Sequence, residues 1–220
     1  MFTVVDMSSI DHKKYNWYTA TPPLCREDSQ MSPCDYFGRE LVNNLPSEIS
    51  IGIINIAVGG CSIDLYIEEK YEEYLSTADI IIQKMAALYG NNLFRALVKA
   101  GKEAQKVGVI KGILLHQVES NSMDPNWTKN VKLVYDRLLL ELGLNGSERP
   151  LLVGEVVDSA MGGLAGFHNN IIATIPSIIP NSYVIQSDNL AHIGDGLHFT
   201  SAAIREFGRR YAYRMLDILE

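Results

Sequence analysis

Four short apolar runs, separated by stretches with helical periodicity, constrain the fold of this 220-residue chain more than any other feature. The runs are rich in Ile, Val or Leu at both odd and even positions, which is typical of parallel strands covered by helices on both faces. Strands that alternate with helices predict a three-layer α/β fold with a mainly parallel sheet. The four predicted strands are Ile51–Val58, Val109–Leu115, Leu151–Val157 and Tyr183–Gln186.

Apolar residues at helical spacing place the helices. Ser32-Pro33 is typical of a helix start, with serine as the N-cap and proline at the first helical position. Phe37, Leu41 and Leu45 then repeat every four residues along one stripe. Further helices are predicted at about 64–76, 78–106, 126–142, 168–175 and 201–219. The polar stretch 6–34 is expected to form a long ordered loop.

Length and charge limit the classes of protein. No repeat or linker divides the chain, so we predict one domain over residues 1–220. A net charge of −7 without a long basic run argues against nucleic acid or an anionic membrane as the main partner. No apolar run approaches the roughly 18 residues of a spanning helix. Residues 1–15 show no signal-peptide pattern, which leaves the compartment open.

The chain has three cysteines, Cys25, Cys34 and Cys61. This odd, low count does not describe a disulfide scaffold, and the cysteines lack the CxxC spacing of a metal site. A single Cys25–Cys34 bridge and free thiols both fit the sequence.

Polar and glycine-containing segments follow each predicted strand. Because active sites of parallel sheets lie beyond the carboxyl ends of the strands, these segments are expected to meet at one rim. An Asp three residues before a His, just ahead of a C-terminal helix, is how several hydrolases place a general base. The segments are Gly59-Gly60, His116–Ser120, Glu155 with the Gly162-Gly163 loop, and Asp195–His198.

In order and spacing, these blocks resemble the carbohydrate-esterase branch of the SGNH hydrolases, the sialate O-acetylesterase-like and acetylxylan esterase group (carbohydrate esterase family six). The resemblance implies a flavodoxin-like fold and the removal of acetyl groups from the hydroxyls of an acetylated carbohydrate, without a cofactor or metal. Members of this group are often secreted. The matching segments are Asn16–Cys25, Asp35–Arg39, Gly52–Ile63, His116–Ser120, Asp195–Thr200 and Phe207–Tyr211.

The resemblance also implies residue roles. His198 would be the general base and then the acid, and either Asp195 or Glu119 would be its acidic partner. Gly60 would give a backbone N–H to the oxyanion, and Gln117 would add a side-chain donor. His168 and Glu155 are expected to bind substrate, although a helix-capping role for His168 and a solvated strand end for Glu155 also fit.

Two departures from the family pattern matter. Val118 replaces the glycine of a His-Gln-Gly-Glu motif, and a β-branched residue does not easily adopt a positive φ. The nucleophilic serine of the family lies in a Gly-x-Ser-Asn block on the first, central strand, ahead of the segment that starts here at Met1. We therefore expect that this strand is missing, and that a gap between Ile51–Val58 and Val109–Leu115 is filled by Phe2–Val5 or by another chain, or that the strands close up.

The missing block leaves alternatives for the function. Ser62, Ser8 and Ser9 are weaker candidates for the nucleophile. A catalytically inactive, sugar-binding remnant is the main rival of an active esterase. A nucleotide or phosphate binder is a weaker rival because the chain lacks a Gly-rich phosphate loop with a lysine.

Overall fold

The computed structural model describes residues 3–5, 16–24 and 31–219. Within this part, the strands form two three-stranded sheets with the orders β2-β1-β3 and β4-β5-β6. All neighbouring strands are parallel except β2, which is antiparallel to β1. The strands are β1 (Thr3–Val5), β2 (Tyr18–Thr19), β3 (Gly52–Ile54), β4 (Ile113–Leu115), β5 (Leu151–Gly154) and β6 (Ser182–Ile185).

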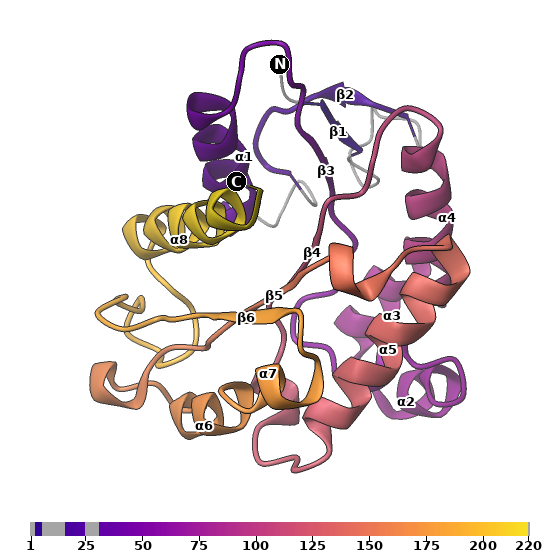
Figure 1. Ribbon diagram of the computed structural model, residues 1–220. Coiled ribbons are helices and arrows are strands. Elements are labelled where there is room, and N and C mark those ends of the chain that lie inside the picture. Colours follow the sequence, from indigo (N-terminus) through magenta and orange to yellow (C-terminus); the bar gives the residue numbers. More distant parts are fainter. Residues whose placement is uncertain (1–2, 6–15, 25–30, 220) are drawn as a thin grey trace.

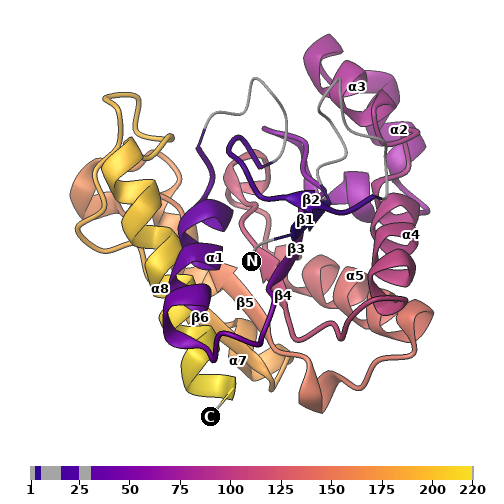
Figure 2. The same ribbon diagram turned by 90° about the horizontal axis from the view of Figure 1, so that it is seen from above.

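Helices lie on both sides of the strands, with α1 and α8 on one side and α4, α5 and α7 on the other (Figures 1 and 2). Short 3-10 turns include η2 (Ile63–Tyr66), η3 (Glu119–Asn121), η5 (Ser159–Met161) and η6 (Gly166–His168). None of the described helices is both long and apolar enough to cross a membrane. The α-helices are α1 (Pro33–Asn44), α2 (Tyr71–Thr77), α3 (Ile80–Ala87), α4 (Leu93–Gln105), α5 (Trp127–Leu142), α6 (Asn169–Ile172), α7 (Ile175–Ile178) and α8 (Ser201–Leu219).

β5 shows why the second sheet is stable. All four of its residues are buried. Leu152 packs into a cluster with Phe207 of α8, whereas Leu151 and Val153 pack into a cluster with Trp127 of α5. Alternate side chains therefore enter two cores, as expected for a strand that is covered on both faces.

The close packing of α1 on α8 depends on Gly208. A Cβ at this position would lie 2.4 Å from the Pro33 carbonyl oxygen and 2.9 Å from the Cβ of Tyr36. The absence of a side chain thus lets the two helix backbones approach each other.

The prediction of one helix over 78–106 is wrong, because the structure has two helices, α3 and α4. Gly90 and Asn91 between them have φ of +75° and +67°. Successive left-handed residues end a right-handed helix. The next residue, Asn92, then caps α4 by accepting the backbone N–H of Arg95 at 3.0 Å. The predicted 64–76 helix is likewise divided into η2 and α2, and the predicted 168–175 helix falls on the end of η6, on α6 and on the start of α7.

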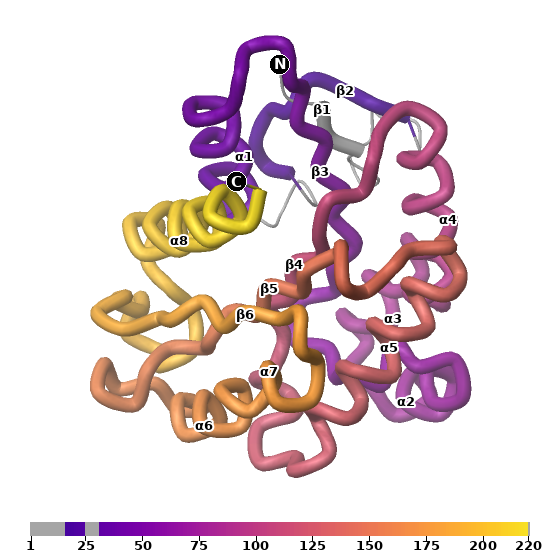
Figure 3. The backbone as a smooth tube through the Cα atoms, in the orientation of Figure 1, coloured from indigo at the N-terminus to yellow at the C-terminus, as the bar shows by residue number. Residues whose placement is uncertain are grey.

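The two sheets are not joined by hydrogen-bonded strands. In the described part of the chain, β3 pairs only with β1, and β4 pairs only with β5. β3 lies between β1 and β4 (Figure 2), so Thr3–Val5 does not fill the expected gap. The backbone of β3 and β4 can be followed in Figure 3. Phe2 lies outside the described residues. Leu114, in the middle of β4, is 36% exposed, which is unusual for a strand predicted to be covered on both faces.

Candidate active site

His198 and Asp195 form a direct pair on the loop before α8. The Nδ1 atom of His198 lies 2.6 Å from Oδ2 of Asp195. The other carboxylate oxygen, Oδ1, accepts the backbone N–H groups of Leu197 and His198, each at 2.9 Å. This local folding of the loop holds the carboxylate toward the ring.

The pair has the electrostatics of a general-base site. The hydrogen bond from His198, with the two backbone N–H groups, holds the pKa of Asp195 well below its usual range, so the carboxylate is ionised at neutral pH. An ionised carboxylate against Nδ1 favours the tautomer with the proton on Nδ1 and leaves Nε2 as an acceptor. The His198 side chain is 76% exposed, so Nε2 is accessible to a substrate.

Glu119, the alternative partner for His198, lies elsewhere. Its Oε2 accepts the backbone N–H of Val118 at 3.3 Å, and its Oε1 is 4.0 Å from Nε2 of His116. The His116 ring in turn lies 6.1 Å from that of Phe199, the residue after His198. The loop after β4 is therefore next to the loop before α8, but the carboxylate that holds His198 is that of Asp195.

The loops that follow β3 and β4 are tied together. Gln117 Nε2 donates to the Cys61 carbonyl at 2.8 Å, and the Ser120 hydroxyl donates to the Gly60 carbonyl. Asn121 Oδ1 accepts the backbone N–H of Ile63 at 2.8 Å. These bonds bring the predicted oxyanion residues, Gly60 and Gln117, into one unit.

Gly60 itself suits an oxyanion donor. It is exposed, its φ is +72°, and a Cβ would meet nothing within 4 Å. Its N–H makes no hydrogen bond within the described residues.

Both polar atoms of the Gln117 side chain are hydrogen-bonded within the fold. Its Nε2 also donates to Asn121 Oδ1 at 2.9 Å, and its Oε1 accepts the indole N–H of the buried Trp127 at 2.9 Å. A primary amide has only two N–H donors, and both are engaged. Gln117 cannot donate to an oxyanion in this conformation unless one of these bonds breaks.

Val118 does not adopt the left-handed conformation that its glycine-like position suggested. Its φ is −164°, and its side chain is 1% exposed in a cluster with Ile63 and Trp127. The added bulk therefore enters the core and not the open side of the loop.

The two predicted substrate-binding residues lie in different surroundings. His168 is completely buried, with Nδ1 accepting the backbone N–H of Met123 at 3.2 Å and burial lowering its pKa. It lines no surface that a sugar can reach. Glu155 is half-buried, which raises its pKa, and its Oε2 accepts the backbone N–H of Ser187 at 2.9 Å. This bond ties the end of β5 to the segment after β6.

The alternative nucleophiles gain no support. Ser62 is buried, and its Oγ accepts N–H groups from Asp64 and Asn121, each at 3.1 Å. Ser8 and Ser9 lie outside the described residues, as does Cys25 of the considered disulfide. Burial raises the pKa of the Cys61 thiol to about 12, which makes it unreactive at neutral pH.

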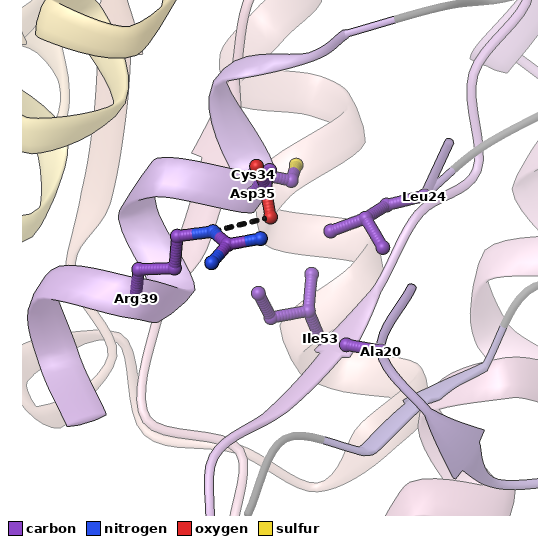
Figure 4. A pocket seen from close by; sticks show the side chains of 6 residues that line it. All are labelled: Ala20, Leu24, Cys34, Asp35, Arg39 and Ile53. Carbon is purple, nitrogen blue, oxygen red and sulfur yellow. Dashed lines mark hydrogen bonds and ion pairs between the residues drawn. The ribbon is translucent and has the colours of Figure 1, made fainter. Parts of the chain in front are cut away.

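One pocket lies away from this site. It is lined by residues of β3, α1 and the preceding loop, where Arg39 Nε bonds Asp35 Oδ1 at 2.9 Å (Figure 4). At about 90 Å³ it is well below the roughly 300 Å³ of a usual ligand pocket. Within the described residues, no group of three His, Cys, Asp or Glu side chains could hold a metal ion. The pocket residues are Ala20, Leu24, Cys34, Asp35, Arg39 and Ile53.

Two residues of the site were missed from the sequence. Asn121 links Gln117 to the segment Ser62-Ile63, and its position four residues after Gln117 was the available signal. His192 closes the loop that carries Asp195 and His198, and no motif indicates it.

The mainly parallel strands with helices on both sides define a protein of the α/β class, and the Asp195–His198 pair lies on the loop before its last helix. The model of the carbohydrate esterase family of sialic acid-specific acetylesterases matches residues 6–217. The chain belongs to this family of carbohydrate esterases, which implies O-acetylesterase activity on carbohydrates.

A solved structure supports the fold. An Arabidopsis thaliana protein, determined by X-ray crystallography at 1.6 Å resolution, is similar with a TM-score of 0.67 and 20% identity. The match covers 98% of this chain and 80% of the plant protein. At this identity, the similarity extends to the fold alone.

Proposed function

We propose that the chain is the catalytic domain of a carbohydrate O-acetylesterase that acts on acetylated sugars of the acetylxylan or sialate type. The observation that carries the proposal is the 2.6 Å pair between His198 Nδ1 and Asp195 Oδ2, with an exposed ring. The family membership supports the reaction class.

In the proposed mechanism, a serine hydroxyl attacks the acetyl carbonyl and His198 Nε2 takes the hydroxyl proton. The Asp195 carboxylate stabilises the imidazolium that forms. His198 then returns the proton to the sugar oxygen that leaves, and a water molecule hydrolyses the acetyl-enzyme by the same route.

Gly60 N–H is the direct donor to the oxyanion in this proposal. Such a donor is typically worth about 3–4 kcal/mol of transition-state stabilisation. Gln117 acts by holding the Cys61 carbonyl, because both of its N–H groups are already engaged.

The nucleophile is proposed to come from an additional strand between β3 and β4, contributed by a Gly-x-Ser-Asn segment or by a partner chain. The support is the lack of pairing between β3 and β4 in the described part and the exposure of Leu114. A sugar-binding protein without catalysis is the second candidate. This second candidate is favoured because, within the described residues, no serine hydroxyl is hydrogen-bonded to His198.

The test is acetate release from an aryl acetate, acetylated xylan and an O-acetylated sialic acid by the parent chain and by His198→Ala. A fall of about 10³-fold or more in the variant supports the esterase. A fluorophosphonate probe, followed by mass spectrometry, then identifies the modified serine. Equal inactivity of parent and variant shows that this chain alone lacks a nucleophile. Inactivity that persists in a chain extended by a Gly-x-Ser-Asn segment, together with retained sugar binding, would establish the non-catalytic alternative.

A further inference from the structure

His192 lies at the start of the loop that carries the Asp195–His198 pair. Its Nδ1 accepts the backbone N–H groups of Gly194 at 3.0 Å and of Gly196 at 2.8 Å. These two glycines flank Asp195, and both have positive φ, +111° and +72°. The imidazole of His192 therefore accepts the backbone N–H groups of a tight turn that lies outside any helix or strand.

The rest of the loop closes around the same ring. His192 and Phe199 form an antiparallel bridge, and Ile193 N–H donates to the His198 carbonyl at 2.9 Å. On the other side, a Cβ at Gly162 would lie 3.5 Å from Nε2 of His192. The ring is thus held between its own loop and the turn after η5.

The acceptor role fixes the chemical form of His192. A nitrogen that accepts two N–H bonds carries no proton, so the neutral ring has its proton on Nε2. His198 has the opposite tautomer, because its Nδ1 faces the carboxylate of Asp195. Two histidines on one loop are therefore held in opposite tautomers.

We propose that His192 is a positioning residue for the Asp195–His198 pair. Its Nδ1 fixes Gly194 and Gly196, these fix Asp195 between them, and Asp195 orients His198. This inference deepens the proposed esterase function and rests on it for its catalytic consequence, although the structural consequence can be measured without catalysis.

The matched variants are His192→Ala and His192→Asn. Asn carries its Oδ1 the same number of bonds from Cα as the Nδ1 of His, so it can accept the same two N–H groups. Ala removes the acceptor. Ile193→Ala, at a 65% exposed side chain of the same loop, is the control for a general effect of substitution.

The first readout is the set of ¹⁵N shifts of the imidazole rings at a pH where they are neutral. We expect the Nδ1–H tautomer for His198 and the Nε2–H tautomer for His192 in the parent chain. His198 should lose its tautomer preference in His192→Ala and keep it in His192→Asn and Ile193→Ala. An unchanged His198 in His192→Ala, or equal loss in His192→Asn, would overturn the proposal.

The second readout is the kinetics of ester hydrolysis. We expect kcat to fall about 10- to 100-fold in His192→Ala with little change in KM, and to recover in His192→Asn. If the parent, also when extended by a Gly-x-Ser-Asn segment, is inactive but the tautomers behave as expected, the esterase function fails and the positioning role stands. If the parent is active and His192→Ala keeps both kcat and tautomer, the positioning role fails alone.

Discussion

Asp195 and His198 lie three residues apart on one loop, whereas Gly60 and Gln117 come from loops that follow two different strands. The His198 ring is exposed, and its Nε2 is available for chemistry. Every polar atom of the Gln117 side chain, in contrast, is bonded within the fold. The two halves of the candidate site thus differ: the His198 ring is free to contact a substrate, whereas the polar atoms of Gln117 are used in hydrogen bonds within the fold.

The difference teaches that a residue in a catalytic motif can contribute mainly by holding the backbone. Gln117 connects the Cys61 carbonyl, Asn121 and Trp127, and so fixes the loop on which the Gly60 N–H lies. His198 contributes little to folding because it makes few buried contacts. Substitution of Gln117 should therefore mainly lower the stability of the fold, and substitution of His198 should mainly lower the activity.

The largest effect on stability is expected from Gln117→Ala. The change leaves the buried Trp127 N–H without an acceptor and the Cys61 carbonyl without its donor. An unsatisfied buried group costs about 1–3 kcal/mol, so the free energy of unfolding should fall by about 2–4 kcal/mol. Urea denaturation measures this, with His198→Ala as the comparison that should lower the free energy of unfolding by less, because the His198 side chain is 76% exposed. Equal losses in the free energy of unfolding of Gln117→Ala and His198→Ala would contradict the proposed difference between the two halves of the site.

A smaller effect is expected in the coupling between Gln117 and Asn121. Their side chains share a 2.9 Å hydrogen bond, so a double-mutant cycle with Ala should show a coupling energy of about 1 kcal/mol. His198→Ala combined with Asn121→Ala should be additive within about 0.5 kcal/mol, since no hydrogen bond connects these residues. Additivity in the Gln117 cycle would mean that the network does not act as a unit.

The same contrast explains what the sequence could predict. The Asp195–His198 pair was predictable because three-residue spacing in a Gly-containing loop is a local feature. The bond from Gln117 to the Cys61 carbonyl joins residues 56 positions apart, and no local pattern indicates it. The complete burial of His168, which was expected to bind substrate or to cap a helix, has no local signal either, because it depends on packing against Trp127, whose ring centroid lies 5.4 Å away.

The fold shows a similar division. The order of β3 to β6 followed from hydrophobic periodicity, and α1, α5 and α8 lie where the apolar stripes predicted them, whereas β1 and β2 were not predicted. The break at Gly90-Asn91 was missed because apolar residues continue on both sides of it. The pairing of β1 with β3 could not be predicted, since the three residues Thr3–Val5 carry too little pattern to specify a partner.

Asp195→Asn should alter the pH dependence of stability. The pKa of Asp195 is lowered in the folded chain, chiefly by the His198 hydrogen bond. Its contribution is therefore present above the unfolded pKa of about 4 and is lost as the pH falls through the folded value. Urea unfolding at pH 7 and pH 3 should show a larger difference between parent and variant at pH 7. Asp217→Asn, at a mostly exposed side chain on α8, is the matched control and should show little difference at either pH.

Glu155→Gln should show the smallest effect, with the opposite sign. Burial raises the pKa of Glu155 in the folded chain, so the folded state holds its proton more tightly than the unfolded state does. The parent should then lose stability relative to the variant as the pH rises from about 4 to 7. The glutamine Oε1 can still accept the Ser187 N–H, which isolates the charge from the hydrogen bond. If Asp195→Asn and Glu155→Gln shift the pH dependence in the same direction, burial does not raise the pKa of Glu155 in the folded chain.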